Sequence, residues 1–259
     1  MCKNSLTEYL IFIYMNWFDE NTPLIILDEK KNINIKKISD LYCIESINEI
    51  KVWGCDGWVD IEKIEKRLLQ EDENMIEIIS PCGYFSCLST MTINGDLANN
   101  IKKGDSVKTT WNVPVNIPVG EENKINFYTI GKNIEEGMEI PGDILNTTSA
   151  NQVLFFGGFY SKNSTDSIIE IDTQCKAQSI WLLARKLCYC YELIYLENTF
   201  HKIKRVRTQN KKIDRVELYR VERACDSPSY IYSIIFKQHE NVKSYSVNVG
   251  VGEICIDIL

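Results

Sequence analysis

The order of strand-like and helix-like segments limits this 259-residue chain to few architectures. From Leu24 to Leu88, short Ile- and Val-rich segments are broken by turn-forming stretches such as Gly54-Cys55-Asp56-Gly57 and Pro81-Cys82-Gly83. Strand character returns from Glu217 to Ile258, whereas Ala177 to Tyr191 has the three- and four-residue spacing of an amphipathic helix. A β-rich beginning and end around a mixed middle predict an α+β protein with an inserted module.

Three local assignments complete this prediction. A helix is expected to begin at Thr148 or Ser149 and to continue to about Tyr160. A strand at Ser167 to Ile171 is expected before the later helix. The run from Ile61 to Leu69 is short, and its apolar spacing fits either a helix or a strand with an irregular end.

The composition excludes several protein classes. An apolar content of 44%, with 5 Trp, 9 Phe and 13 Tyr residues, is ample for a core and argues against disorder. A net charge of -7 argues against a protein that coats nucleic acid, although it leaves room for a local basic face. The 10 cysteines form no Cys-x-x-Cys pair and His201 and His239 lie far apart, so we expect buried thiols and no metal site.

The apolar run near the start, Tyr9 to Phe18, is too short to span a membrane. It also lacks the basic leader and the small-residue cleavage site of a signal peptide. We therefore expect an intracellular, cytoplasmic protein that does not associate with membranes.

Short motifs occur at both ends of the chain in an order known from one protein family. They are Asn21-Thr22-Pro23-Leu24-Ile25-Ile26, Asp56-Gly57-Trp58-Val59-Asp60-Ile61, Asn94-Gly95-Asp96, Lys103-Gly104-Asp105 and Val249-Gly250-Val251-Gly252-Glu253-Ile254. In this order they resemble the Hint (hedgehog/intein) domain of DNA polymerase inteins. The resemblance implies a β-rich horseshoe formed by both ends of the chain.

The middle of the chain carries Ile140-Pro141-Gly142-Asp143-Ile144-Leu145-Asn146 and then Phe156-Gly157-Gly158-Phe159-Tyr160-Ser161-Lys162-Asn163-Ser164. This stretch resembles the LAGLIDADG (DOD-type) homing endonuclease inserted in such inteins. The family pairs two motif helices whose terminal carboxylates share metal ions, so the single motif recognised here implies a half-domain that needs a dimer. The resemblance divides the chain into a tail at 1–16, Hint-like parts at 17–107 and 215–259, and an endonuclease-like insert at 108–214.

The resemblance places the splicing residues at positions that cannot perform the chemistry. The opening nucleophile falls at Trp17 or Asn16, neither of which can attack a carbonyl group. The Thr-x-x-His motif corresponds to Leu88-Ser89-Thr90-Met91, and methionine cannot carry a proton. The terminal His-Asn pair corresponds to Ile256-Asp257, which lacks the side-chain amide that cyclises. We therefore expect that splicing is lost.

The endonuclease position is also substituted. The carboxylate that ends the motif helix corresponds to Asn163, next to Ser161 and Lys162, which is a poor site for Mg²⁺. Asp166 and Asp172 are close in sequence, but we expect them to be solvated carboxylates of a turn and a strand. The sequence thus predicts no catalytic residue and no cofactor, with Mg²⁺ required only if another carboxylate replaces Asn163.

One feature favours binding to nucleic acid. Nine Lys and Arg residues lie between positions 202 and 223, and Lys202-Ile203-Lys204 alternates as one face of an amphipathic strand does. The alternative is a solvated sheet face balanced by the acidic remainder of the chain. The residues of this basic stretch are Lys202, Lys204, Arg205, Arg207, Lys211, Lys212 and Arg215, followed by Arg220 and Arg223.

These observations predict an intein-derived protein that has lost both activities and is retained as a non-catalytic binding protein. Double-stranded DNA is the first candidate partner. Two alternatives stay open: a structural or protein-interaction module, including a homodimer, and a LAGLIDADG DNA endonuclease with residual activity.

Overall fold

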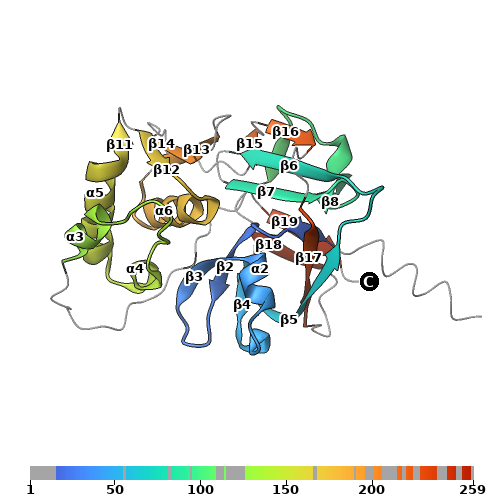
Figure 1. Ribbon diagram of the computed structural model, residues 1–259, viewed down its shortest axis with the longest axis horizontal. Coiled ribbons are helices and arrows are strands. Elements are labelled where there is room, and N and C mark those ends of the chain that lie inside the picture. Colours follow the sequence, from blue (N-terminus) through green and yellow to red (C-terminus); the bar gives the residue numbers. More distant parts are fainter. Residues whose placement is uncertain are drawn as a thin grey trace, which may run out of the picture.

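The computed structural model is a mixed α+β fold with a large curled antiparallel sheet and few helices. Figure 1 shows the large sheet on the right and in the centre, and α3 to α6 gathered on the left. The structure describes residues 16–54, 57–80, 83–93, 95–108, 114, 126–165, 168–189, 191–195, 201–205, 215–217, 220–223, 228–237, 244–248 and 253–257.

Both ends of the chain contribute to the large sheet. Its strands follow the order β16-β6-β7-β1-β17-β5-β4-β18-β19, and β2 pairs with β3 and β4. The short β1 lies between β7 and β17, so that Trp17 is opposite Ser233 and Phe18 is opposite Cys87. From the first half come β1 (Trp17–Asp19), β2 (Pro23–Leu27), β3 (Ile33–Lys37), β4 (Lys51–Gly54), β5 (Gly57–Leu68), β6 (Met75–Ser80) and β7 (Gly83–Leu88). From the end of the chain come β16 (Arg220–Arg223), β17 (Tyr230–Phe236), β18 (Ser244–Asn248) and β19 (Glu253–Asp257).

A bulge in β5 explains why the sequence pattern there was ambiguous. The strand pairs antiparallel with β17, beginning with Leu68 opposite Tyr230. The register shifts by one residue near the other end, where Ile235 is opposite Lys63 but Phe236 is opposite Ile61. The extra residue, Glu62, places Ile61 and Ile64 three positions apart while both side chains are buried. This three-residue spacing resembles that of a helix, but the segment is a strand.

A two-stranded sheet joins the two boundaries of the middle segment. β10 (Ser106–Lys108) pairs antiparallel with β15 (Arg215–Glu217), with Val107 opposite Val216. The chain therefore leaves the β-rich part at β10 and re-enters it at β15, which lies directly beside β10. The small elements of this part are α2 (Ile38–Tyr42), η2 (Ile47–Glu49), β8 (Thr92–Ile93), β9 (Asp96–Leu97) and η3 (Ala98–Asn100).

The segment between β10 and β15 contains the larger helices and a second sheet in the order β11-β12-β14-β13. Both helices expected there are present, and the strand predicted at 167–171 is β12. The later helix ends at Lys186 because Cys188 has a positive φ of 58° and the Tyr189 N–H donates to the Ala184 carbonyl. The elements are α3 (Phe127–Lys132), α4 (Gly142–Asn146), α5 (Ser149–Asn163), β11 (Ser164–Thr165), β12 (Ile168–Ile171), α6 (Gln174–Lys186), β13 (Tyr191–Tyr195) and β14 (His201–Arg205).

Helix α4 attaches this segment to the edge of β3 that is not paired with β2. The Asn146 side chain accepts a hydrogen bond from the Ile33 N–H at 2.7 Å and donates one to the Ile33 carbonyl at 2.8 Å. It thereby satisfies backbone groups at a strand edge that would otherwise need water. Buried apolar residues form one cluster that includes Ile33 of β3, Leu145 of α4 and Leu183 of α6.

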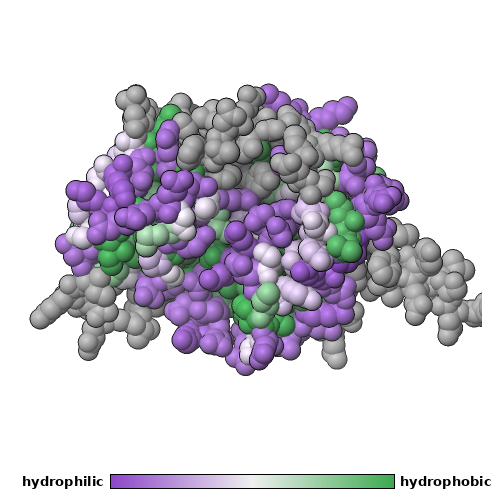
Figure 2. All heavy atoms as spheres, viewed as in Figure 1, coloured by the Kyte–Doolittle hydropathy of each residue, from purple (hydrophilic) through white to green (hydrophobic). Residues whose placement is uncertain are grey.

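The surface on the side shown in Figure 2 is mostly hydrophilic, with several small separate apolar areas. No helix in the part of the chain that the structure describes is both long enough and apolar enough to cross a membrane.

Candidate functional site

Two of the positions predicted for splicing lie in neighbouring strands of the large sheet, Trp17 in β1 and Leu88 in β7, whereas positions 256 and 257 lie in β19 at the end of its strand order. Trp17 of β1 and Leu88 of β7 belong to one buried cluster that also contains Met75 and Ile231. The Met91 N–H donates to the Leu88 carbonyl at 3.0 Å. β8, which follows Met91, contacts β19, the strand that carries positions 256 and 257. The fold therefore brings together segments that are far apart in the sequence.

The side chains of Trp17, Leu88 and Met91 offer no nucleophile, acid or base. Trp17, Leu88 and Met91 are each at most 4% exposed. The Arg67 guanidinium lies 4.4 Å from the centre of the Trp17 ring and is held by Glu73 through contacts of 2.5 and 2.6 Å. Burial raises the pKa of the neighbouring Cys87 thiol far above neutral pH, so it cannot supply a thiolate. This region is a packed apolar cluster with an ion pair at its side.

The motif recognised at 156–164 lies on α5, as predicted, but its helix packs against α3 of the same chain. The backbones touch at two glycines. A Cβ atom on Gly131 of α3 would overlap the Phe155 carbonyl oxygen, and one on Gly158 of α5 would overlap the Tyr128 carbonyl oxygen. The sequence analysis expected a second chain to supply the partner helix, whereas α3 occupies this face of α5.

Sequence analysis missed α3 because the helix has only six residues, too few to reveal a period. A signal was nevertheless present. Glu136 follows Gly131 by five positions, and Asn163 follows Gly158 by the same interval. Both of these residues line one pocket where the two helices end.

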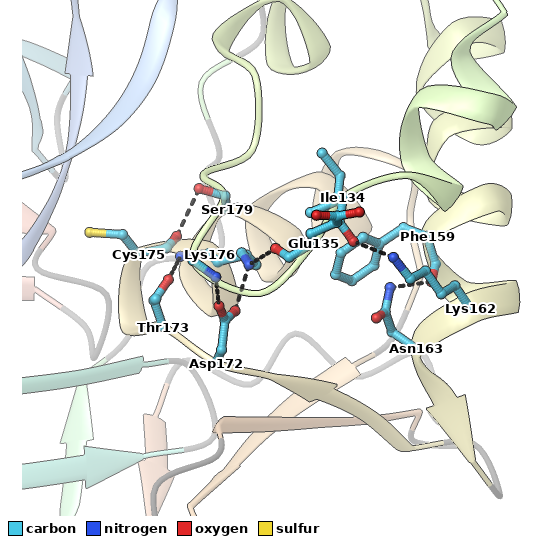
Figure 3. A network of polar contacts seen from close by, with 11 residues as sticks. Ile134, Glu135, Phe159, Lys162, Asn163, Asp172, Thr173, Cys175, Lys176 and Ser179 are labelled. Carbon is cyan, nitrogen blue, oxygen red and sulfur yellow. Dashed lines mark hydrogen bonds and ion pairs between the residues drawn. The ribbon is translucent and has the colours of Figure 1, made fainter.

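The pocket has a volume of about 150 Å³ and is lined by both polar and apolar side chains. Asn163 turns its amide nitrogen back to the helix, where Nδ2 donates to the Phe159 carbonyl at 2.9 Å. Lys162 reaches the loop after α3 and donates to the Ile134 carbonyl at 2.9 Å. Figure 3 shows these contacts together with those of Lys176. The lining residues are Ile134, Glu135, Glu136, Phe159, Asn163, Glu170, Ile171, Asp172 and Lys176.

Asp172 is not the solvated carboxylate that the sequence analysis expected. Its side chain is only 14% exposed and forms an ion pair of 2.5 Å with Lys176, one turn later on α6. Its second carboxylate oxygen accepts a hydrogen bond from the Gly137 N–H. Partial burial alone would raise the pKa of Asp172, but the hydrogen bonds from Lys176 and Gly137 outweigh it and hold the pKa below its usual value.

These donors do not fit Mg²⁺. Among the described residues, no three His, Cys, Asp or Glu side chains group closely enough to hold a metal ion. Asp172 is committed to Lys176 and to a backbone N–H, and an ammonium group lies where a cation would bind. Asp166, the other carboxylate considered from the sequence, lies outside the described residues.

The basic stretch is divided among three sheets. Lys202, Lys204 and Arg205 are in β14, Arg215 is in β15, and Arg220 and Arg223 are in β16 at the end of the large sheet. Arg207, Lys211 and Lys212 lie outside the described residues. The structure thus does not place the described members on a single strand.

The register of β14 agrees with the alternation expected from its sequence. Ile203 lies opposite Ile169, which is fully buried, and Lys202 lies opposite Glu170, whose side chain is exposed. Residues directly opposite each other share one face of a sheet, so Lys202 and Lys204 belong to the face that includes Glu170. Lys204 is also opposite Glu192 of β13, so each of the two lysines has one acidic residue directly across from it, and Ile168 and Ile194 complete the two rows.

Comparison of the chain with models of protein families and with curated proteins finds no match. The relation to inteins therefore stays a prediction from the sequence motifs.

Proposed function

We propose that this chain is a degenerate intein whose splicing and endonuclease sites are lost, and that it acts as a non-catalytic protein that binds double-stranded DNA. The observation that carries the proposal is the pairing of α3 and α5 through Gly131 and Gly158. Glu136 follows Gly131 by five positions and Asn163 follows Gly158 by five positions, and both residues line one pocket. A pair of motif helices accounts for this arrangement, one ending in Asn163 and the other followed by the loop that carries Glu136.

The topology of the β-rich part supports the same origin. A Hint domain that is interrupted by an endonuclease needs both chain ends in one sheet. The inserted segment must also begin and end at points that lie close together. The insertion of β1 between β7 and β17 satisfies the first requirement. The pairing of β10 with β15 satisfies the second.

The chemistry of the sites argues for binding without catalysis. Trp17, Leu88 and Met91 form packed apolar contacts where splicing needs a nucleophile and a proton carrier. Asn163 replaces one acid of the helix pair, and Lys162 and Lys176 add positive charge around it. Cleavage of DNA through a shared metal ion would need a group of oxygen ligands, and the described residues bring no three carboxylate, His or Cys side chains together for this.

DNA is the preferred partner because of the positive residues on β14. Lys202 and Lys204 share one face of the small sheet, whereas Arg205 belongs by its register to the opposite face. Phosphate contacts of this kind bind duplex DNA without reading its sequence, and they weaken as salt rises. Because Glu170 belongs to the same face, we expect weak binding that depends on a few phosphates.

The test is fluorescence anisotropy with a mixed-sequence duplex at low salt, using the wild-type chain and K202Q/K204Q. The matched control is K30Q/K31Q, which removes the same charge from the turn between β2 and β3 at the other end of the molecule in Figure 1. We expect K202Q/K204Q to bind at least about tenfold more weakly than the wild type and the control to bind normally. No binding by the wild type, or equal losses in both variants, would contradict the proposal.

A second candidate is a protein-interaction surface on β5 and β17. Leu68 is 60% exposed and lies opposite Tyr230, while the Lys66 ammonium is 4.0 Å from the centre of the Tyr230 ring and 5.6 Å from that of Tyr42. Exposed aromatic and aliphatic side chains that lie together are common in protein interfaces. Sedimentation of the wild type and of L68S/Y230S tests this candidate, because self-association that the substitutions abolish would favour it over DNA binding.

A further inference from the structure

Three tyrosine rings surround the ammonium group of Lys66, an exposed residue of β5. The Lys66 Nζ atom lies 4.0 Å from the centre of the Tyr230 ring. The rings of Tyr42 and Tyr232 are centred 5.6 and 5.7 Å from the same atom. All three distances are within the range of about 6 Å over which the face of an aromatic ring attracts a cation. These three rings are called the tyrosine cage below.

Strand register and one short helix bring the cage together. Tyr232 lies directly opposite Lys66 in the pairing of β17 with β5, and Tyr230 is two positions earlier on the same strand. Both tyrosines therefore belong to the sheet face that includes Lys66. Tyr42 is the last residue of α2, and its ring meets the Tyr232 ring at an angle of 69° with the centres 5.8 Å apart.

Two walls of the cage are open to solvent. Tyr42 is 45% exposed and Tyr230 is 41% exposed, whereas Tyr232, at 4%, forms the buried wall. Because Lys66 is itself exposed, its side chain can leave the rings without disturbing the core. The cage is thus accessible to a second cation.

The Lys66 ammonium is held by the rings and not by an acid. Its slight desolvation lowers its pKa, but the hydrogen bond to Tyr232 and the nearby rings outweigh this effect and raise the pKa of Lys66. No carboxylate of the described residues contributes to this shift, and the nearby Glu65 pairs with Lys63 at 2.6 Å. Such a cage suits a quaternary ammonium group, which has no N–H to satisfy, whereas a lysine ammonium is strongly hydrated.

We infer that the tyrosine cage binds the quaternary ammonium group of a trimethylated lysine on a partner protein, and that Lys66 occupies the cage when the partner is absent. A protein is favoured as the source because Leu68, which is 60% exposed and opposite Tyr230, adds apolar surface for the residues beside such a lysine. The inference goes beyond the proposed function and does not depend on DNA binding.

The test is saturation-transfer NMR on the wild-type chain with three short glycine-flanked peptides. One carries trimethyllysine, one carries lysine, and one carries the neutral isostere in which a tert-butyl group replaces the trimethylammonium group. The trimethyllysine peptide should bind at least about fivefold more tightly than either of the others, because only its cation is both attracted to the rings and easily desolvated. Equal binding of the three peptides, or binding of none, would overturn the inference.

Three variants locate the site. K66Q should bind the trimethyllysine peptide at least about threefold more tightly than the wild type, because the competing ammonium is removed. Y42A/Y230A should lose the preference for this peptide. Y128A is the matched control, since Tyr128 of α3 is similarly exposed, at 42%, and should bind normally. Equal binding by Y42A/Y230A and Y128A, or weaker binding by K66Q, would contradict the assignment. If Y42A/Y230A does not fold, the preference of the wild type and its increase in K66Q decide.

A vesicle experiment checks the source of the ammonium group. The wild type should not sediment with phosphatidylcholine vesicles, although their headgroup carries the same cation. Sedimentation that Y42A/Y230A abolishes would overturn the choice of a protein partner and assign the cage to a lipid surface. DNA binding is measured separately, so its failure leaves these results unaffected.

Discussion

Gly131 of α3 and Gly158 of α5 lie where the backbones of two helices touch, each beneath a carbonyl oxygen of the opposite helix. A side chain of any size at either position would force the helices apart. Two consecutive glycines follow Phe156, but only Gly158 contacts the α3 backbone, while Gly157 faces the Tyr128 ring at 4.0 Å. The two glycines of one motif therefore have different roles.

This difference can be measured with two alanine substitutions on the same helix. G158A should lower the free energy of unfolding by about 1–3 kcal/mol or more, because the new methyl group overlaps the Tyr128 carbonyl oxygen. G157A should stay within about 1 kcal/mol of the wild type, since its methyl group meets ordinary contact distances and alanine favours the helix. Urea unfolding checks both. Equal losses would mean that α3 and α5 do not pack as described.

Trp17, which the sequence motifs align with the splicing nucleophile, is part of a buried apolar cluster. W17A should destabilise the protein by about 3–5 kcal/mol, because it empties the cluster shared with Met75, Leu88 and Ile231. W17F should lose less, since an aromatic ring still fills most of the space. Denaturant unfolding with both variants checks the prediction, and a loss below about 1 kcal/mol for W17A would show that the cluster is poorly packed.

Asp172 should make the stability depend on acidic pH. Its pKa is lower in the folded protein than the ordinary value of 3.8, so the unfolded chain binds more protons in that range. The stability that this group contributes is present above pH 3.8 and is lost as pH falls through the lower folded pKa. The free energy of unfolding, measured from about pH 6 to pH 2, should therefore fall less steeply in D172N/K176M than in the wild type. Identical slopes would exclude a linkage through Asp172.

The elements that could be predicted from the sequence are those with a long regular pattern. α5 and α6 have enough turns to show their apolar stripes, and β6 and β7 flank an obvious turn. The sequence of β5 fitted either a helix or a strand, because one bulge interrupts the alternation of its apolar residues. That bulge arises from pairing with β17, which lies some 170 residues later in the chain. The end of α6 was misjudged because it depends on the left-handed conformation of Cys188.

The candidate site was only partly predictable for a similar reason. The substituted positions Trp17, Met91 and Asn163 follow from motifs, and their chemistry follows from residue type. The pairing of α3 with α5 and the ion pair of Asp172 with Lys176 arise from tertiary contacts that no local pattern encodes. The basic stretch was read as one surface, whereas strand pairing sends its described members to different sheets.

The central claim is that the chain binds DNA and does not cut it, and a salt series with an end-labelled mixed-sequence duplex tests this most directly. With Mg²⁺ present, affinity and intact DNA are read from the same samples. We expect uncut DNA and an affinity that falls steeply with salt, with a slope that K202Q/K204Q reduces by about 1–2. Absence of binding at low salt would contradict the claim, and cut DNA would show that the pocket at Asn163 still supports catalysis.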